Sequence, residues 1–119
     1  MWSYNVQYGT VTHDENFEGV GYSGNGDGLN NPAMEDKMDI GPTPRGLYKI
    51  EGFFDDLEKG PVVTHLDPDP SNEMYGRSGF MIHGDNQSMN HSASDGCIIL
   101  ARDIREAIRD SEDMELTVI

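Results

Sequence analysis

The sequence has few positively charged residues, and this makes several classes of binding partner unfavourable. Only 8 of its 119 residues are lysine or arginine, against 22 aspartates and glutamates, which gives a formal net charge of −14. A surface this acidic repels phosphate backbones and anionic lipids, so we expect neither nucleic acid nor a membrane among its partners. The acidic residues are spread along the chain, which is typical of a solvated surface rather than an interaction tail.

Cysteine and long hydrophobic runs are also scarce. A single cysteine excludes an internal disulfide, so the fold does not depend on an oxidising compartment. No apolar stretch reaches the roughly 18 residues that a membrane span requires, and the first residues lack the basic and apolar regions of a signal peptide. We therefore expect a soluble protein, synthesised in the cytoplasm without a signal peptide and not inserted into a membrane.

Length and hydrophobic patterning predict one mostly β domain over residues 1–119, because a chain of this size fits a single core. Alternating or continuous apolar runs predict strands at 2–8, 17–22, 47–53, 62–66, 80–83, 97–100 and 116–118. Apolar residues at 100, 104, 107 and 108 have helical spacing and predict one helix, with Arg102, Arg105 and Arg109 on its other sides. The turn-rich segments 23–32 and 67–72 are expected to be loops.

Chemistry is predicted between residues 83 and 97, which include the only cysteine and two of the four histidines. A thiol attacks as a thiolate, so it needs an imidazole within hydrogen-bond reach and N–H groups for the developing oxyanion. His83 would supply the imidazole. Gly96 lets the main chain turn sharply beside Cys97 and approach a bound carbonyl. If the apolar runs that end at His83 and begin at Cys97 are neighbouring strands, the pair meets at the rim of the sheet.

These residues resemble the L,D-transpeptidase (YkuD-like) catalytic domain, whose signature is His-Gly followed by Ser/Thr-His-Gly-Cys. Here the signature reads His83-Gly84 and then Ser94-Asp95-Gly96-Cys97, and residues 43–50 resemble the Thr-Pro-x-Gly segment of that family. Closer still is the Tlde1-like domain of type VI secretion effectors, whose pattern is resembled in order by residues 22–24, 28–32, 41–46, 76–80, 82–85 and 92–98. The resemblance implies a compact, YkuD-like mixed β-sheet or sandwich.

The resemblance also implies a reaction. Cys97 attacks a carbonyl of a peptidoglycan stem peptide to form a thioester, and His83 activates the thiol and protonates the leaving amine. The acyl group then passes to water, as in an L,D-carboxypeptidase, or to an amine, in transpeptidation or D-amino-acid exchange. Backbone N–H groups of Gly96 and Cys97 would hold the oxyanion, and the Gly84 carbonyl would orient the His83 ring. No cofactor and no metal is implied.

Two departures from the family pattern affect the predicted site. Family members carry histidine before Gly-Cys and arginine two residues after the cysteine, where this chain has Asp95 and Ile99. Because a carboxylate that faced the sulfur would oppose thiolate formation, we expect Asp95 to point away and Ser94 or main-chain groups to replace the histidine. Arg77 is the candidate clamp for a substrate carboxylate, since guanidinium binds carboxylate bidentately.

The sequence allows two interpretations of the role of several residues near Cys97. Ser92 and Ser94 are either substrate contacts or turn formers that satisfy local main-chain groups. His91 either assists His83 or is an exposed loop residue. Without the family motifs, Cys97 itself would be interpreted as a small buried hydrophobe.

Two other classes of function stay open at the level of sequence. His83, Asp85, His91 and Cys97 offer ligands for a zinc-dependent hydrolase, although their spacing matches no standard zinc motif. The second alternative is a non-catalytic acidic binding protein of the immunity or phage-structural type. The effector interpretation predicts an enzyme that acts in the periplasm of a target cell, delivered there by a secretion system or a phage. By analogy, it also predicts a cognate immunity protein.

Overall fold

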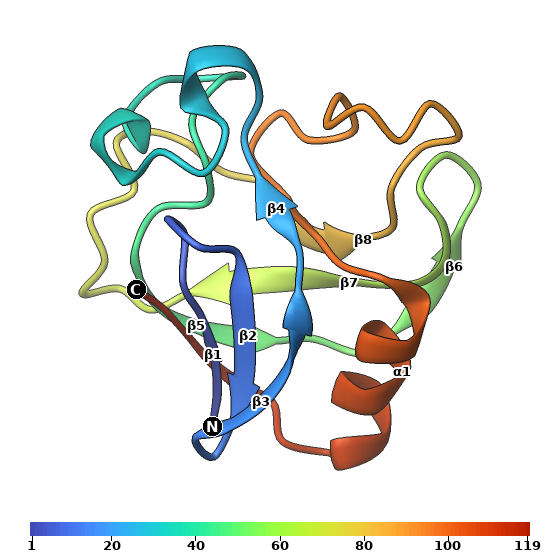
Figure 1. The fold of residues 1–119 in the computed structure, drawn as a ribbon. Helices are drawn as coiled ribbons and strands as arrows, with labels where there is room; N and C mark the ends of the chain where they lie inside the picture. Colours follow the sequence, from blue (N-terminus) through green and yellow to red (C-terminus); the bar gives the residue numbers. More distant parts are fainter.

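The computed structural model describes residues 1–119 as a strongly bent sheet with one α-helix packed against it (Figure 1). The helix is α1 (Arg102–Ser111), and two single-turn 3-10 helices, η1 (Gly26–Gly28) and η2 (Pro32–Met34), lie in the long loop after β4. The strands are β1 (Trp2–Tyr4), β2 (Thr10–His13), β3 (Asn16–Val20), β4 (Tyr22–Ser23), β5 (Gly46–Ile50), β6 (Phe54–Asp56), β7 (Gly60–Pro68), β8 (Met81–His83), β9 (Ile98–Ile99) and β10 (Glu115–Val118). The predicted fold class, mostly β with one short helix, is confirmed.

The strand order is β3-β2-β1-β10-β5-β7-β8-β9-β4. The first and last strands of this order are consecutive in the sequence. β3 and β4 stand at opposite ends of this order, yet only Gly21 separates them in sequence. The Gly21 N–H donates to the Gly9 carbonyl at 2.8 Å, and a Cβ at position 21 would lie 2.0 Å from the Ile99 carbonyl oxygen. Residues 16–23 therefore join β2 to β9, and the sheet wraps around the core.

The core consists of the inward-facing side chains of the strands and the helix. In the parallel pair of β1 and β10, Trp2 lies opposite Leu116 and Tyr4 opposite Val118, and all four are buried. Burying a large apolar side chain contributes about 1.5–3 kcal/mol. The complete core cluster comprises Trp2, Tyr4, Val6, Val11, Tyr48, Ile50, Leu66, Phe80, Ile82, Ile98, Leu100, Ile104, Ile108, Leu116 and Val118.

The first predicted strand is too long. Residues 2–4 form β1, but the chain then turns, so Val6 is buried whereas Tyr8 is 67% exposed. The cause is Asn5, whose side-chain oxygen accepts the Tyr8 N–H at 3.0 Å and whose carbonyl accepts the Gly9 N–H at 2.7 Å. Asparagine commonly stabilises turns in this way.

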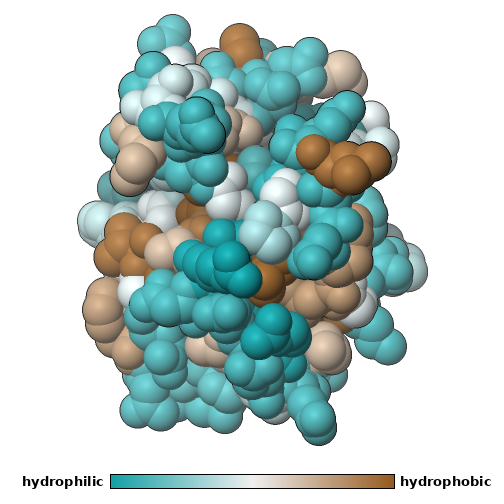
Figure 2. All heavy atoms as spheres, turned by 90° about the vertical axis from the view of Figure 1, so that its right-hand side faces the viewer, coloured by the Kyte–Doolittle hydropathy of each residue, from teal (hydrophilic) through white to brown (hydrophobic).

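The side of the molecule that carries β6, α1 and the loop after β8 is mostly hydrophilic, with isolated hydrophobic groups (Figure 2). This agrees with the excess of acidic residues. α1 is 10 residues long, and no helix in the structure has the length and apolarity needed to cross a membrane.

Candidate active site

Parallel pairing of β8 with β9 places His83 and Cys97 on one face of the sheet. Ile82 lies opposite Ile98, and His83 lies opposite Ile99. Because side chains alternate along a strand, Ile82 and Ile98 enter the core while His83 and Cys97 project from the other face at diagonal positions. Diagonal neighbours on a sheet face are roughly 7–8 Å apart, a spacing that an imidazole and a thiol can bridge.

The His83 ring is oriented by the residue that follows it. Its Nδ1 lies 2.8 Å from the Gly84 carbonyl oxygen, which can only accept, so Nδ1 carries the proton and Nε2 has a free lone pair. The side chain is 3% exposed, and this burial lowers the pKa of the imidazole below its usual 6.5. His83 is therefore neutral at pH 7 and can accept a proton through Nε2.

Burial raises the pKa of the Cys97 thiol above its usual 9.0, and nearby groups modify this shift. The Met81 main-chain N–H and the positive charges of Lys59 and Arg77 lower the pKa, whereas the Asp95 carboxylate raises it. The resting pair is thus a neutral thiol and a neutral imidazole.

Cys97 and His83 line two different pockets. The Cys97 pocket, of about 240 Å³, is lined by Met38, Asp39, Gly76, Arg77, Ser78, Gly79, Phe80, Asp95, Gly96 and Cys97. The His83 pocket, of about 230 Å³, is lined by Glu58, Lys59, His83, Gly84, Asp85, Asn86 and Ala93. An extended ligand whose reacting bond lay at the Cys97–His83 pair would occupy both.

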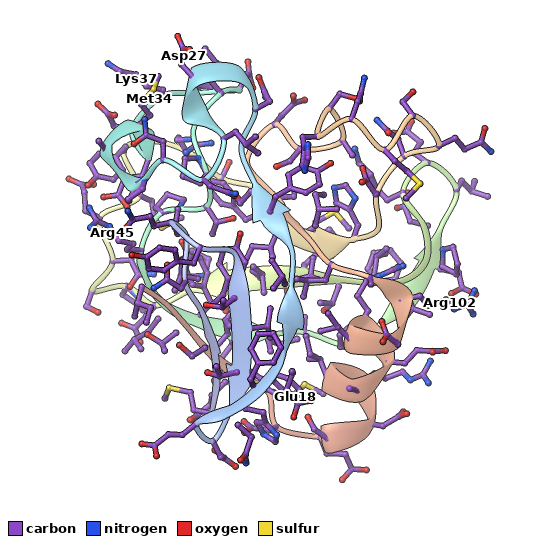
Figure 3. The ribbon with its side chains drawn as sticks, viewed as in Figure 1. Glu18, Asp27, Met34, Lys37, Arg45 and Arg102 are labelled. Carbon is purple, nitrogen blue, oxygen red and sulfur yellow. The ribbon has the colours of Figure 1, made fainter.

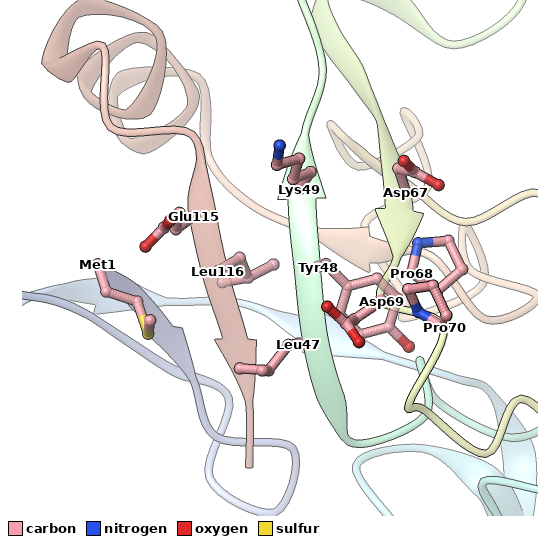
Figure 4. Close-up of a pocket in the computed structure, with 10 residues that line it drawn as sticks. All are labelled: Met1, Leu47, Tyr48, Lys49, Asp67, Pro68, Asp69, Pro70, Glu115 and Leu116. Carbon is pink, nitrogen blue, oxygen red and sulfur yellow. The ribbon is translucent and has the colours of Figure 1, made fainter.

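A larger hollow, of about 420 Å³, lies across β10, β5 and β7 and contains neither reactive residue (Figure 4). It is bordered by side chains such as Met1, Leu47, Lys49, Asp67 and Glu115. It shares no lining residue with the Cys97 pocket or the His83 pocket. Size alone therefore does not identify the reactive site in this fold.

The predicted oxyanion donors differ in their availability. The Gly96 N–H donates to the Ser94 hydroxyl at 3.1 Å and is turned away from a substrate, whereas the Cys97 N–H has no acceptor within the protein. Gly96 is required by the shape of the turn, because its φ is +145° and a Cβ there would lie 2.6 Å from Nη2 of Arg77. The expectation for Gly96 as an oxyanion donor is corrected, and Cys97 supplies the available N–H.

Ser94 is a turn former. Its hydroxyl is fully buried, accepts the Gly24 N–H at 3.0 Å and the Gly96 N–H at 3.1 Å, and donates to the Cys97 carbonyl at 2.6 Å. These bonds use its donor and both acceptor positions. Ser94 thus fixes the backbone on both sides of Gly96, and this favours the structural interpretation over a substrate contact.

Ser92 and His91 are exposed residues of the loop between β8 and β9. The Ser92 hydroxyl accepts from the Asn86 side-chain amide at 2.9 Å. The His91 ring packs edge-on against Tyr22, with centroids 4.8 Å apart and planes at 74°. Neither residue lines the Cys97 pocket or the His83 pocket, so the structure favours His83 as the sole base.

Arg77 lines the Cys97 pocket, but its guanidinium is already engaged. It is 7% exposed, and its Nη atoms donate to three carbonyls of residues 35–42 at 2.6, 2.8 and 2.9 Å and to the Asp95 carbonyl at 3.4 Å. All four Nη hydrogens have main-chain acceptors, so the predicted bidentate grip on a substrate carboxylate does not fit. Arg77 instead ties loop 35–42 to the turn before Cys97.

Arg105 was expected on a side of the helix away from its apolar residues, but it is buried beside the candidate site. It is 7% exposed, its Nε donates to the Leu100 carbonyl at 3.1 Å, and its Nη1 donates to the Pro61 and Val62 carbonyls at 2.6 and 3.1 Å. A Cβ at Gly84 would lie 2.7 Å from its Nη2. Arg105 therefore packs against the residue whose carbonyl orients the base. The burial of Arg105 could have been expected from its position next to the apolar residues of the helix.

The four residues considered as zinc ligands, His83, Asp85, His91 and Cys97, do not form a group of potential metal ligands. The one such group, with ligand atoms within 4.8 Å of one another, is His13, Asp14 and Asp113. The N-terminal ammonium contacts Asp14 at 2.7 Å and Asp113 at 2.6 Å and so already neutralises this cluster. The predicted zinc set is thus not assembled by the fold.

Asp95 is exposed and lines the Cys97 pocket, and the charge of its carboxylate raises the pKa of the thiol. We expect Asp95→Asn to increase the rate of Cys97 alkylation by iodoacetamide at pH 7 by up to about fivefold, since the charge acts through solvent at an exposed site. Asp69→Asn, in the exposed loop after β7, is the charge-matched control and should change nothing. An unchanged rate for Asp95→Asn would contradict the placement of the carboxylate.

The neutral resting pair predicts a particular pH dependence of thiol alkylation. Because the pKa of Cys97 is raised above 9.0 and that of His83 is lowered below 6.5, the thiolate fraction stays small at neutral pH and grows only under alkaline conditions. The alkylation rate, followed by intact-protein mass, should rise continuously from pH 6 to pH 9 and beyond. A plateau beginning near pH 5 would instead indicate a preformed thiolate–imidazolium pair.

The fold and the site define a mostly β domain with a histidine–cysteine pair on one face of a parallel strand pair. A family model, the Tlde1 domain, matches residues 18–117, and the chain therefore belongs to the Tlde1 domain family. No curated protein and no solved structure matches the chain. The matched span includes His83 and Cys97. Membership suggests a type VI effector domain and is consistent with an antibacterial role related to peptidoglycan.

Proposed function

We propose that this protein is a peptidoglycan-modifying cysteine enzyme that acts on stem peptides as an L,D-carboxypeptidase, an L,D-transpeptidase or a D-amino-acid exchange enzyme. The observation that carries the proposal is the placement of Cys97 and His83 on one sheet face, with Nε2 of the imidazole left unprotonated by the Nδ1 hydrogen bond to Gly84. A thiol beside a neutral, oriented imidazole is the arrangement that nucleophilic acyl transfer requires.

In the first step, the sulfur of Cys97 attacks the stem-peptide carbonyl while its proton passes to Nε2 of His83. The Cys97 N–H donates to the oxyanion of the tetrahedral intermediate. The C–N bond then breaks, Nε2 returns the proton to the leaving amine, and the acyl group remains on the sulfur as a thioester.

In the second step, water or an acceptor amine attacks the thioester and gives a proton to His83. The C–S bond breaks and the thiol recovers that proton, so the enzyme returns to its starting state. Water yields a shortened stem, and an amine yields a crosslink or an exchanged terminal residue. The substrate lies in the periplasm of the target cell, and a cognate immunity protein would block the pocket in the producing cell.

Mass spectrometry of muropeptides tests this proposal. After incubation with purified protein, tetrapeptide stems should lose a terminal D-amino acid, exchange it or form crosslinked dimers. Intact-protein spectra should show the corresponding acyl adduct, mapped to Cys97. Iodoacetamide should abolish both signals and EDTA should leave them unchanged. Activity that EDTA removes but iodoacetamide spares would favour a metal-dependent hydrolase, and unchanged stems with no adduct would overturn the proposal.

A further inference from the structure

Lys59 lines the His83 pocket at the tip of the β6–β7 hairpin, which approaches the loop after β8 (Figure 1). Its side chain is exposed and forms no ion pair. The ammonium is near enough to both reactive groups to lower the pKa of the imidazole and that of the thiol. Lys59 is therefore a cation of the His83 pocket that forms no ion pair, although its charge also acts on the Asp56 carboxylate.

The other cations of the chain are not available at this place. Four form ion pairs with neighbouring carboxylates: Lys37, Arg45, Arg102 and Arg109. The labelled members of this set lie at the periphery of the molecule (Figure 3). Arg77 and Arg105 are buried on main-chain carbonyls. Only Lys49 and Lys59 remain, and Lys49 belongs to the distant hollow across β5 (Figure 4).

The position of His83 decides which part of a substrate meets Lys59. The base must protonate the amine that leaves, so the leaving amino acid lies on the His83 side of Cys97 and the acyl part lies in the Cys97 pocket. In a terminal amino acid, the free α-carboxylate is two bonds from that amine. A cation that shares a pocket with His83 is thus placed to contact it.

We propose that Lys59 binds the free α-carboxylate of the terminal amino acid that leaves the stem, and so makes the enzyme selective for stems with an unblocked C-terminus. This inference rests on the proposed function. In a protein of net charge −14, one unpaired ammonium in the pocket offsets the repulsion that an anionic substrate meets elsewhere.

Two carboxylates share the pocket with Lys59 and oppose an anion, Glu58 and Asp85. One oxygen of Asp85 is already engaged, because its Oδ1 accepts from the Tyr22 hydroxyl at 2.7 Å and from the Asn86 N–H at 2.9 Å. Lys59 is the only lysine or arginine that lines this pocket. Without it, the charged side chains at the pocket would all be carboxylates, which repel an anion.

Lys59→Met tests the inference, with Lys49→Met as the control that changes net charge equally at the distant hollow. On a tetrapeptide stem with a free C-terminus, Lys59→Met should lower kcat/KM by about 10- to 100-fold, the loss typical of one charge-assisted hydrogen bond. On the same stem with a C-terminal amide, the loss caused by Lys59→Met should be much smaller, and Lys49→Met should match the parent protein on both stems. Equal losses by Lys59→Met on the two stems would overturn the inference.

A second readout does not depend on peptidoglycan activity. Iodoacetate and iodoacetamide alkylate the same thiol but differ in charge, so the ratio of their rates at Cys97 reports the attraction for a carboxylate. Lys59→Met should lower this ratio by about two- to fivefold and Lys49→Met should not. If the protein does not modify muropeptides but Lys59→Met still lowers the iodoacetate-to-iodoacetamide rate ratio, the proposed function is wrong and the anion-binding role of Lys59 is supported. If muropeptides are processed but the ratio and the amide preference do not change, only the Lys59 inference fails.

Discussion

Replacing Cys97 with alanine should lower the turnover of stem peptides by at least about 1,000-fold, because no other group in either pocket can form the thioester. The free energy of unfolding should change by about 1 kcal/mol or less, since the thiol projects from the sheet face opposite the core. Muropeptide mass spectrometry measures the first quantity and urea denaturation the second.

His83→Ala should cause a loss of similar size, and the double variant should be no worse than either single one, because the two residues act as a unit. Ser92→Ala, in the exposed loop, serves as the control and should retain full turnover. Full antibacterial effect of Cys97→Ala would favour a non-catalytic binding protein. Additive losses in the double variant would separate His83 from the chemistry of Cys97.

Arg105→Met should destabilise the protein by about 3–5 kcal/mol, because it leaves the buried carbonyls of Leu100 and Val62, and the partly buried carbonyl of Pro61, without their donor. The same change removes the support beneath Gly84, so the residual folded protein should also lose turnover. Urea denaturation monitored by the fluorescence of Trp2, which is 1% exposed, measures the free energy of unfolding.

Arg102→Met is the matched control on the same helix. Arg102 is exposed and meets only Glu106, at 3.5 Å, so its loss should cost about 0.5 kcal/mol or less. If Arg105→Met is too unstable to purify, Arg105→Lys keeps the charge and part of the hydrogen bonding and should give a measurable intermediate loss. Equal stability of the Arg102 and Arg105 variants would contradict the structural role of Arg105.

The strands that carry the strongest apolar patterns were predictable from sequence, because burial on one face imposes a period of two. Met81–His83 and Ile98–Ile99 lie within predicted segments, and Glu115–Val118 begins one residue before its predicted segment. β2 and β6 were not predicted, since Thr10–His13 and Phe54–Asp56 are short and largely polar. These two strands are stabilised by pairing with β1 and β7, and their own residues show no hydrophobic alternation from which this pairing could be predicted.

The placement of His83 and Cys97 on neighbouring strands was predictable because both residues lie at the ends of apolar runs, whereas the surrounding network was not. The roles of Arg77, Arg105 and Ser94 depend on main-chain atoms far away in sequence, such as the Arg105 bonds to residues 61 and 62. The same holds for Lys59, whose neighbour His83 is brought close by the pairing of β7 with β8. Residue types alone do not indicate which carbonyls need a donor.

The segment 84–97 connects two parallel strands without a helix of its own. The ladder between β8 and β9, rather than this connection, sets the positions of His83 and Cys97. Within it, residues 86–93 can lengthen, shorten or change while Gly84, which orients His83, and the turn at Ser94 stay in place. If the proposed function holds, relatives of this domain can therefore vary the ligand or protein partner that this loop contacts without altering their chemistry.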